Sequence, residues 1–212
     1  MSTNEPLRSV RFSDDERGAW SSDRPRRDGA AQRPADISTR CRILSPSDRL
    51  RYSPGSLLLL VAPSAAERDR FAARVIEDRN AYLSLDKVRA LLRGRVPAEE
   101  AEQRAVELLD TAVGKRIEAG ETVVLGVDGL GVEAREPYVR MAAAVRRPRH
   151  VILLEAGRDE ADEEGRAALD ELRRALVAGD LGSEGVQTAL RLSGGTVAEV
   201  KKIVFRPPPR DE

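Results

Sequence analysis

Apolar runs and amphipathic segments alternate along most of this chain. The runs at residues 57–61 and 122–127 are continuous and aliphatic, as expected of parallel strands that are buried on both faces. The segments between them repeat apolar residues every three or four positions, a spacing typical of helices packed on a sheet. This alternation predicts an α/β fold, in which a parallel sheet is flanked by helices. The predicted strands are residues 57–62, 81–84, 122–127, 150–155, 186–192 and 200–205, and the predicted helices are residues 64–78, 86–93, 98–119, 133–146 and 159–178.

The two ends of the chain lack this pattern. Residues 1–40 are rich in Arg, Asp, Ser and Pro and have almost no periodic apolar positions, which predicts a disordered arm. Residues 41–206 contain the predicted domain, and residues 207–212 are expected to form an extended tail. Trp20 in the arm suggests a short motif for an unknown protein partner, although a solvated tail is the simpler interpretation.

Composition narrows the range of functions. The 36 basic residues balance the 36 acidic ones, so no overall charge attracts nucleic acid or an anionic membrane. Cys41 is the only cysteine, which excludes an internal disulfide. The only histidine, His150, opens an apolar strand, where a structural role is the simpler interpretation. The chain has neither an apolar run of ~18 residues nor a hydrophobic signal segment, so we expect a cytoplasmic protein with no membrane contact and no metal site.

The turn after strand 57–62 has the position of a phosphate-binding loop but not its residues. Such a loop, G-x-x-x-x-G-K-[ST], joins a buried strand to a helix and wraps nucleotide phosphates. In this register Ala62 and Glu67 replace the two glycines. Arg68 replaces the lysine, and Asp69 replaces the hydroxyl residue that holds magnesium. The chain therefore has the frame of a Walker A loop in a degenerate form.

Two interpretations of this loop remain open. Ser64, Arg68 and Asp69 are the candidate vestigial contacts to a nucleotide, since they still offer a hydroxyl, a cation and a carboxylate. Against this, Glu67 and Asp69 place two negative charges where a polyphosphate would lie. Ser64 and Glu67 also have the spacing of a capping box, which satisfies the free N–H groups at a helix start. We favour the self-capped loop without a nucleotide.

Two further motifs follow the loop in order. The next strand ends in S-x-D-x-x-R, formed by Ser84, Asp86 and Arg89, and a later strand leads to Asp128. With APSAAERDRF in the place of GPSGSGKSTF, this order resembles the kinase domains of the polynucleotide kinase family. Zeta-toxin-like kinases are more distant relatives, and AAA-type ATPases share the P-loop fold. The resemblance spans residues 42–155 and implies a fold like that of P-loop nucleoside triphosphate hydrolases and kinases.

The resemblance also implies roles for individual residues. Asp86 would be the general base that takes a proton from the acceptor hydroxyl, and Arg89 would bind the acceptor phosphate. Arg135, which follows Asp128 sooner than in the family, would be a further substrate-binding arginine. The residues by themselves allow another interpretation, in which Asp86 caps helix 86–93 and Arg89 is solvated on its first turn. Both interpretations remain open.

The segment after strand 150–155 lacks the charge expected of a kinase lid. The family carries an arginine-bearing helical lid there, which closes over the phosphates. Here residues 159–164 are strongly acidic, and Arg158 and Arg166 are the candidates for lid arginines. A solvated helix face explains this segment better.

Three hypotheses of function follow. The joint loss of the loop glycines, the lysine and the lid favours a pseudoenzyme, which is a degenerate P-loop kinase that acts as a non-catalytic binding or regulatory protein without a cofactor. The second hypothesis is a divergent phosphotransferase that uses ATP and magnesium and acts on nucleic-acid 5′ ends or on a small hydroxyl substrate. The third is a nucleic-acid-binding module that has kept only the acceptor half, and the balanced charge counts against it.

Overall fold

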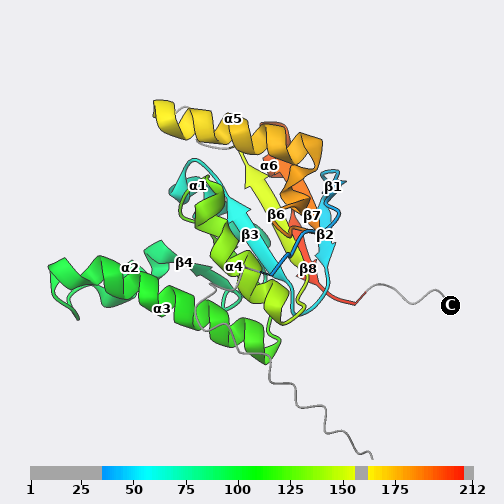
Figure 1. Ribbon diagram of the computed structural model, residues 1–212. Coiled ribbons are helices and arrows are strands. Elements are labelled where there is room, and N and C mark those ends of the chain that lie inside the picture. Colours follow the sequence, from blue (N-terminus) through cyan, green and yellow to red (C-terminus); the bar gives the residue numbers. More distant parts are fainter. Residues whose placement is uncertain (1–34, 156–161, 208–212) are drawn as a thin grey trace, which may run out of the picture. The chain divides into compact units, whose positions relative to one another are not determined.

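Six parallel strands form the central sheet, in the order β1-β7-β6-β3-β5-β4 (Figure 1). The computed structural model describes residues 35–155 and 162–207. The strands of this sheet are β1 (Arg42–Leu44), β3 (Leu57–Val61), β4 (Tyr82–Ser84), β5 (Val123–Gly126), β6 (Arg149–Leu154) and β7 (Thr188–Leu192), and a separate parallel pair consists of β2 (Arg49–Tyr52) and β8 (Lys202–Phe205). The helices are α1 (Ala65–Val75), α2 (Leu85–Leu92), α3 (Ala98–Ala119), α4 (Val132–Ala144), α5 (Glu163–Ala178) and α6 (Gly195–Glu199), with a 3₁₀ turn η2 (Asp180–Gly182).

Helices cover both faces of the six-stranded sheet, as the sequence pattern predicts. β3 shows the arrangement best, because all its residues are buried and they alternate between two apolar clusters. Leu57, Leu59 and Val61 pack in one cluster with residues of α3, α4 and α5. Leu58 and Leu60 pack in the other with α1 and the β2–β8 pair. The predicted fold class, a parallel sheet flanked by helices, is confirmed.

The order of the strands places a crevice beside the end of β3. From β3 the chain crosses by α1 to the edge strand β4, whereas from β5 it crosses by α4 past β3 to β6. Right-handed crossovers that run in opposite directions put their helices on opposite faces of the sheet. The turns that follow β3 and β5 therefore diverge, and ligands of open α/β sheets bind at such a point. The degenerate loop and Asp128 both lie there.

The ends and positions of a few elements differ from the prediction. α1 ends at Val75 rather than at residue 78, because Ile76 leaves the helix and pairs with Ile203. The sequence pattern does not predict β1 and β2, because both are short and β2 alternates exposed arginines with buried apolar residues. The last predicted strand is present as β8, but it pairs with β2 and not with the main sheet.

Most of the predicted arm and tail, residues 1–34 and 208–212, lies outside the described residues. The compact unit begins at Asp36. Thr39 donates a backbone hydrogen bond to the Gly182 carbonyl at 2.8 Å, so the segment before β1 is attached to the domain.

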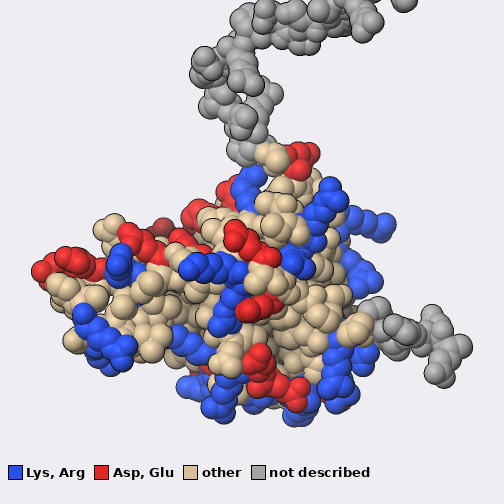
Figure 2. Space-filling view, turned by 90° about the horizontal axis from the view of Figure 1, so that it is seen from below, with Lys and Arg blue, Asp and Glu red and all other residues tan. Residues whose placement is uncertain are grey.

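Charged side chains of both signs lie close together on the surface. The face drawn in Figure 2 shows acidic residues interspersed among basic ones, with lysine and arginine more frequent along its lower rim. This distribution agrees with the equal numbers of acidic and basic residues. Within the described ranges, none of the helices combines the length and the apolar composition that a membrane crossing requires.

His150 is buried at the start of β6 and is expected to make stability depend on pH. Its Nδ1 lies 2.8 Å from Thr188 Oγ1, and its Nε2 lies 3.3 Å from Ser56 Oγ. Burial lowers the pKa of His150 from 6.5 to about 4, so the folded protein holds a neutral imidazole. The unfolded chain therefore binds a proton at His150 more readily than the folded protein does. As the pH falls from 6.5 toward 4, this difference lowers the free energy of unfolding by about 3 kcal/mol in total. Urea unfolding across this range should show a smaller loss for His150→Gln than for the natural protein; equal losses would contradict the assignment.

Candidate functional site

The loop after β3 begins α1 with a serine cap. Ser64 has an extended backbone and its Oγ accepts a hydrogen bond from the Glu67 N–H at 3.4 Å. This is the first half of the predicted capping box, and it is confirmed. The Glu67 carboxylate pairs instead with the exposed Arg70, three residues along the helix. The serine therefore satisfies one of the free N–H groups at the start of the helix.

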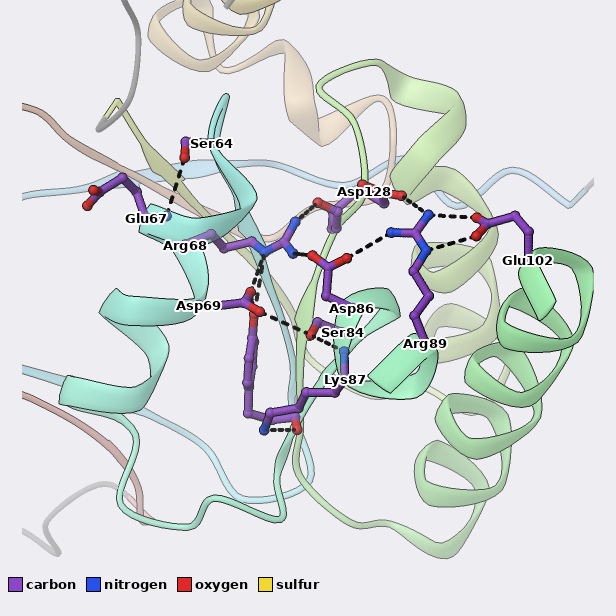
Figure 3. A network of polar contacts seen from close by, with 12 residues as sticks. Ser64, Glu67, Arg68, Asp69, Ser84, Asp86, Lys87, Arg89, Glu102 and Asp128 are labelled. Carbon is purple, nitrogen blue, oxygen red and sulfur yellow. Dashed lines mark hydrogen bonds and ion pairs between the residues drawn. The ribbon is translucent and has the colours of Figure 1, made fainter. Parts of the chain in front are cut away.

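Arg68, which stands at the position of the loop lysine, points into the protein. Its side chain is 2% exposed, and Nη1 donates to the Val127 carbonyl at 2.5 Å. Nε lies 3.1 Å from Asp69 Oδ1, and Nη2 lies 3.7 Å from Asp86 Oδ2. Figure 3 shows the guanidinium between these two carboxylates, below the turn that leads to Asp128. Burial acts to lower the pKa of Arg68, but Tyr82 and Asp69 raise it overall, so the side chain stays charged.

Asp69, at the position of the magnesium-binding hydroxyl, accepts hydrogen bonds from within the protein. Tyr82 Oη donates to its Oδ1 at 2.5 Å, and Ser84 Oγ donates to its Oδ2 at 3.4 Å. Burial and then the bond to Asp69 raise the pKa of the Tyr82 phenol above its ordinary value, so the phenol remains a donor. With Arg68, these contacts use both carboxylate oxygens. A magnesium ion at Asp69 would have to compete with these contacts for the same carboxylate oxygens.

Gly126, the last residue of β5, makes room for the Arg68 side chain. A Cβ added there would stand 2.6 Å from Arg68 Nε and would also collide with the Tyr82 hydroxyl. We expect Gly126→Ala to lower the free energy of unfolding by about 2 kcal/mol, because two buried polar side chains must move. Urea unfolding measures this loss.

The matched control for that substitution is Gly114→Ala in the middle of α3. A Cβ at Gly114 meets nothing within 4 Å. Alanine should therefore stabilise the helix by about 0.5–1 kcal/mol. If Gly126→Ala lowered the free energy of unfolding no more than the control does, Arg68 would not pack against β5 as described.

The S-x-D-x-x-R motif runs from the last residue of β4 into the first part of α2, next to Arg68. Ser84 is the cap of α2, since its Oγ accepts from the Lys87 N–H at 3.4 Å, so the interpretation of Asp86 as the helix cap is wrong. Asp86 Oδ1 accepts from Arg89 Nη1 at 2.9 Å, while Oδ2 faces Arg68. The carboxylate of Asp86 thus joins the two arginines.

Arg89 pairs with carboxylates of α2, of α3 and of the turn after β5, while its side chain stays 36% exposed. Its Nε and Nη2 donate to the two oxygens of Glu102 in α3, at 2.9 and 2.6 Å. Nη2 also lies 3.4 Å from Asp128, and Nη1 binds Asp86. The hydrogen bond with Glu102 is the largest cause of a raised Arg89 pKa. Figure 3 shows the resulting chain of contacts, which runs from α1 across the sheet edge to α3. We call these residues the carboxyl-edge network: Arg68, Asp69, Tyr82, Ser84, Asp86, Arg89, Glu102 and Asp128.

Arg135 does not belong to this network. Its side chain is 5% exposed, and Nε and Nη2 each donate to Glu184 at 2.6 Å. Nη1 donates to the Leu130 carbonyl at 2.8 Å. The pair joins α4 to the turn before β7. A substrate at Arg135 would have to break this buried ion pair.

The crevice above the loop is a cavity of about 410 Å³ with an acidic lining. Its lining includes Arg68 and the acidic residues Asp128, Glu133, Asp162 and Glu164. Among the described lining residues, four carboxylates and one internally paired cation disfavour a polyphosphate. Among the described residues, no three His, Cys, Asp or Glu side chains are grouped to hold a metal ion.

The candidate lid arginines give little support to an anion site. Arg158 lies outside the described residues. Arg166 lies in the first turn of α5, where its backbone N–H donates to the Asp162 carbonyl at 3.0 Å. The helix begins with Asp162 as its cap and with two glutamates in the first turn, as the acidic sequence suggests.

Two members of the network are absent from the sequence predictions. Tyr82 stands two residues before Ser84 on the same strand, so the alternation of strand side chains could have placed both on one side. Glu102 carries no such signal, because it lies on α3 and meets Arg89 through the packing of two helices.

No protein-family model matches this chain, and a search of curated proteins finds no significant relative. The six-stranded parallel sheet flanked by helices is compatible with a P-loop-like α/β fold. The resemblance to kinases therefore rests on the order of the motifs and on their meeting at one edge of the sheet.

Proposed function

We propose that this chain is a degenerate P-loop-kinase-like domain that no longer transfers phosphate and acts as a non-catalytic binding or regulatory protein. The observation that carries the proposal is the position of Arg68. The cation at the lysine position is 2% exposed and is bound to the Val127 carbonyl and to two carboxylates. It is a structural cation, and a nucleotide would have to compete with these partners for it.

The surroundings of Arg68 support the same conclusion. A phosphate-binding loop offers free backbone N–H groups at a helix start, which small glycines allow a phosphate to approach. Here Ser64 caps that helix start, and Glu67 stands where the second glycine would be. The carboxylates of Asp128 and Glu133 line the space above. An ATP tail would meet capped donors and like charges.

The residues of the acceptor half of the kinase pattern are also paired with one another. Asp86, the candidate base, has one carboxylate oxygen on each of two guanidinium groups. Arg89, the candidate phosphate ligand, donates through its fork to Glu102. Since Nε and Nη2 of Arg89 form a bidentate fork with Glu102, an acceptor phosphate would have to compete with Glu102 for that edge of the guanidinium.

A transfer assay tests the proposal against the divergent-kinase alternative. The full chain is incubated with labelled ATP and magnesium, and with either a 5′-hydroxyl oligonucleotide or a mixture of small alcohols. We expect no transfer above the level without protein, both for the natural chain and for Asp86→Asn. Transfer by the natural chain that Asp86→Asn abolishes would establish the kinase and refute the pseudoenzyme.

The nucleic-acid-binding alternative makes a different prediction. If Arg89 holds a nucleic-acid phosphate, affinity for a single strand falls steeply between about 50 and 200 mM salt, and Arg89→Ala weakens it. We expect neither effect, because Arg89 is already paired with Glu102 and Asp86. Fluorescence anisotropy measures the binding, with Arg104→Ala on an exposed face of α3 as the matched control.

A further inference from the structure

A second cavity, of about 430 Å³, opens between α1 and the edge strand β4. One face of α1 forms its wall, and this face repeats at the helical spacing of three and four residues. The volume lies within the range of roughly 300–1,000 Å³ that is typical of small-molecule pockets. This cavity, which we call the edge pocket, is lined by Asp69, Ala72, Ala73, Ile76, Arg79, Tyr82 and Lys87.

The walls of the edge pocket are apolar. Ala72, Ile76 and Tyr82 are each at most 5% exposed, so they form a fixed floor and not a mobile surface. The two alanines on the helix leave the space that a larger side chain would fill. Tyr82 adds an aromatic ring whose hydroxyl is anchored on Asp69. Such walls suit a flat apolar body.

The charges of the edge pocket favour an anion. Lys87 Nζ lies 4.5 Å from the centroid of the Tyr82 ring and donates to the Tyr82 carbonyl at 3.1 Å. Arg79 adds a second cation. Asp69 contributes the carboxylate, and both of its oxygens already accept hydrogen bonds from Arg68, Tyr82 and Ser84. Burial is the main cause of a lowered Lys87 pKa, so an anion beside this ammonium would stabilise its charged form.

We propose that the edge pocket binds a small organic anion with a planar apolar body, such as an aromatic carboxylate. The ring would lie against Ala73, Ile76 and Tyr82, and the carboxylate would pair with Lys87 and Arg79. This inference stands on the cavity and its lining and is independent of the proposed loss of phosphoryl transfer. Because Tyr82 and Asp69 also hold Arg68, the ligand would bind next to the carboxyl-edge network.

A charge-matched series of ligands tests the proposal on the full natural chain. Naphthoate, naphthamide and naphthylmethylammonium share one aromatic body and differ in charge, and ligand-observed NMR gives the dissociation constant of each. We expect naphthoate to bind about tenfold more tightly than the amide, and the ammonium compound to bind most weakly. Equal binding of all three, or no binding of naphthoate at millimolar concentration, would overturn the proposal.

Substitutions locate the binding. Ala73 is an exposed helix position, so Ala73→Trp fills the pocket without entering the core and should weaken naphthoate binding by about tenfold or more. Ala66→Trp, at another exposed position of α1, is the matched control and should leave the affinity unchanged. Lys87→Met keeps the apolar stem and should reduce the preference for naphthoate over naphthamide, since Arg79 remains as the second cation. Binding that survives Ala73→Trp would place the ligand elsewhere and refute the assignment.

Discussion

Replacing Arg68 with alanine is expected to lower the free energy of unfolding by about 3–5 kcal/mol. The substitution removes a cation that is 2% exposed, together with its hydrogen bond to the Val127 carbonyl. Asp69 then keeps a charge with no guanidinium beside it, and the buried stem leaves a cavity. Equilibrium unfolding in urea measures the loss. The thermal midpoint should fall by roughly 2–4 °C for each kcal/mol.

The neighbouring Arg70 provides the matched control for this experiment. Its side chain is 71% exposed and forms an ion pair with Glu67 on the same helix. Arg70→Ala should change the free energy of unfolding by less than about 0.5 kcal/mol. Arg68→Lys restores the residue type of a phosphate-binding loop, but an ammonium cannot reproduce the fork geometry, so this variant should also be destabilised. A fully stable Arg68→Ala protein would show that Arg68 is free for a ligand.

Replacing Arg135 with alanine should have an effect of similar size, about 3–5 kcal/mol. Arg135 and Glu184 are 5% and 15% exposed and are joined by two hydrogen bonds of 2.6 Å. Removing the arginine leaves the Glu184 carboxylate partly buried without its partner. The loss should appear in urea unfolding of the protein alone, with no substrate present, because the role of Arg135 in this structure is to join α4 to the turn before β7.

A double-mutant cycle separates this ion pair from general packing. The variants are Arg135→Met, Glu184→Leu and the combination of both. Because two apolar side chains of similar length leave no buried charge unpaired, the double variant should lose clearly less stability than the sum of the single ones, with a coupling of about 2 kcal/mol. Strictly additive losses would mean that the pair does not form in solution, and a substrate role for Arg135 would regain support.

The sequence predicts most of the scaffold because its signals are local. The aliphatic runs at β3 and β5 indicate buried parallel strands, and both are fully buried. Pro97 and Gly120 mark the ends of α3, where Gly120 takes the left-handed conformation with φ of 79°. β1 and β2 are not predicted, because β1 has only three residues and β2 has four in which arginines alternate with apolar residues.

The sequence predicts the place of the candidate site better than its chemistry. The three segments that carry the resemblance, namely the loop, the motif with Asp86 and the turn with Asp128, meet at the carboxyl ends of β3, β4 and β5. The direction of Arg68 is not predictable from its position in a helix, since it depends on Gly126 and Tyr82 from two other strands. From the sequence, a cation at the lysine position suggests a phosphate ligand. In the fold, the Arg68 guanidinium is bound to the Val127 carbonyl and to Asp69 of the chain itself.

Thermal unfolding of the natural chain with and without millimolar magnesium-ATP tests the central claim most directly. A ligand at ~100 times its dissociation constant adds about 2.7 kcal/mol to the free energy of unfolding, which would raise the midpoint by roughly 5–11 °C in a chain of this size. We predict no shift, because Arg68, Asp69 and the start of α1 are occupied by internal partners. A clear rise with magnesium-ATP would contradict the account and show that the crevice still accepts a nucleotide.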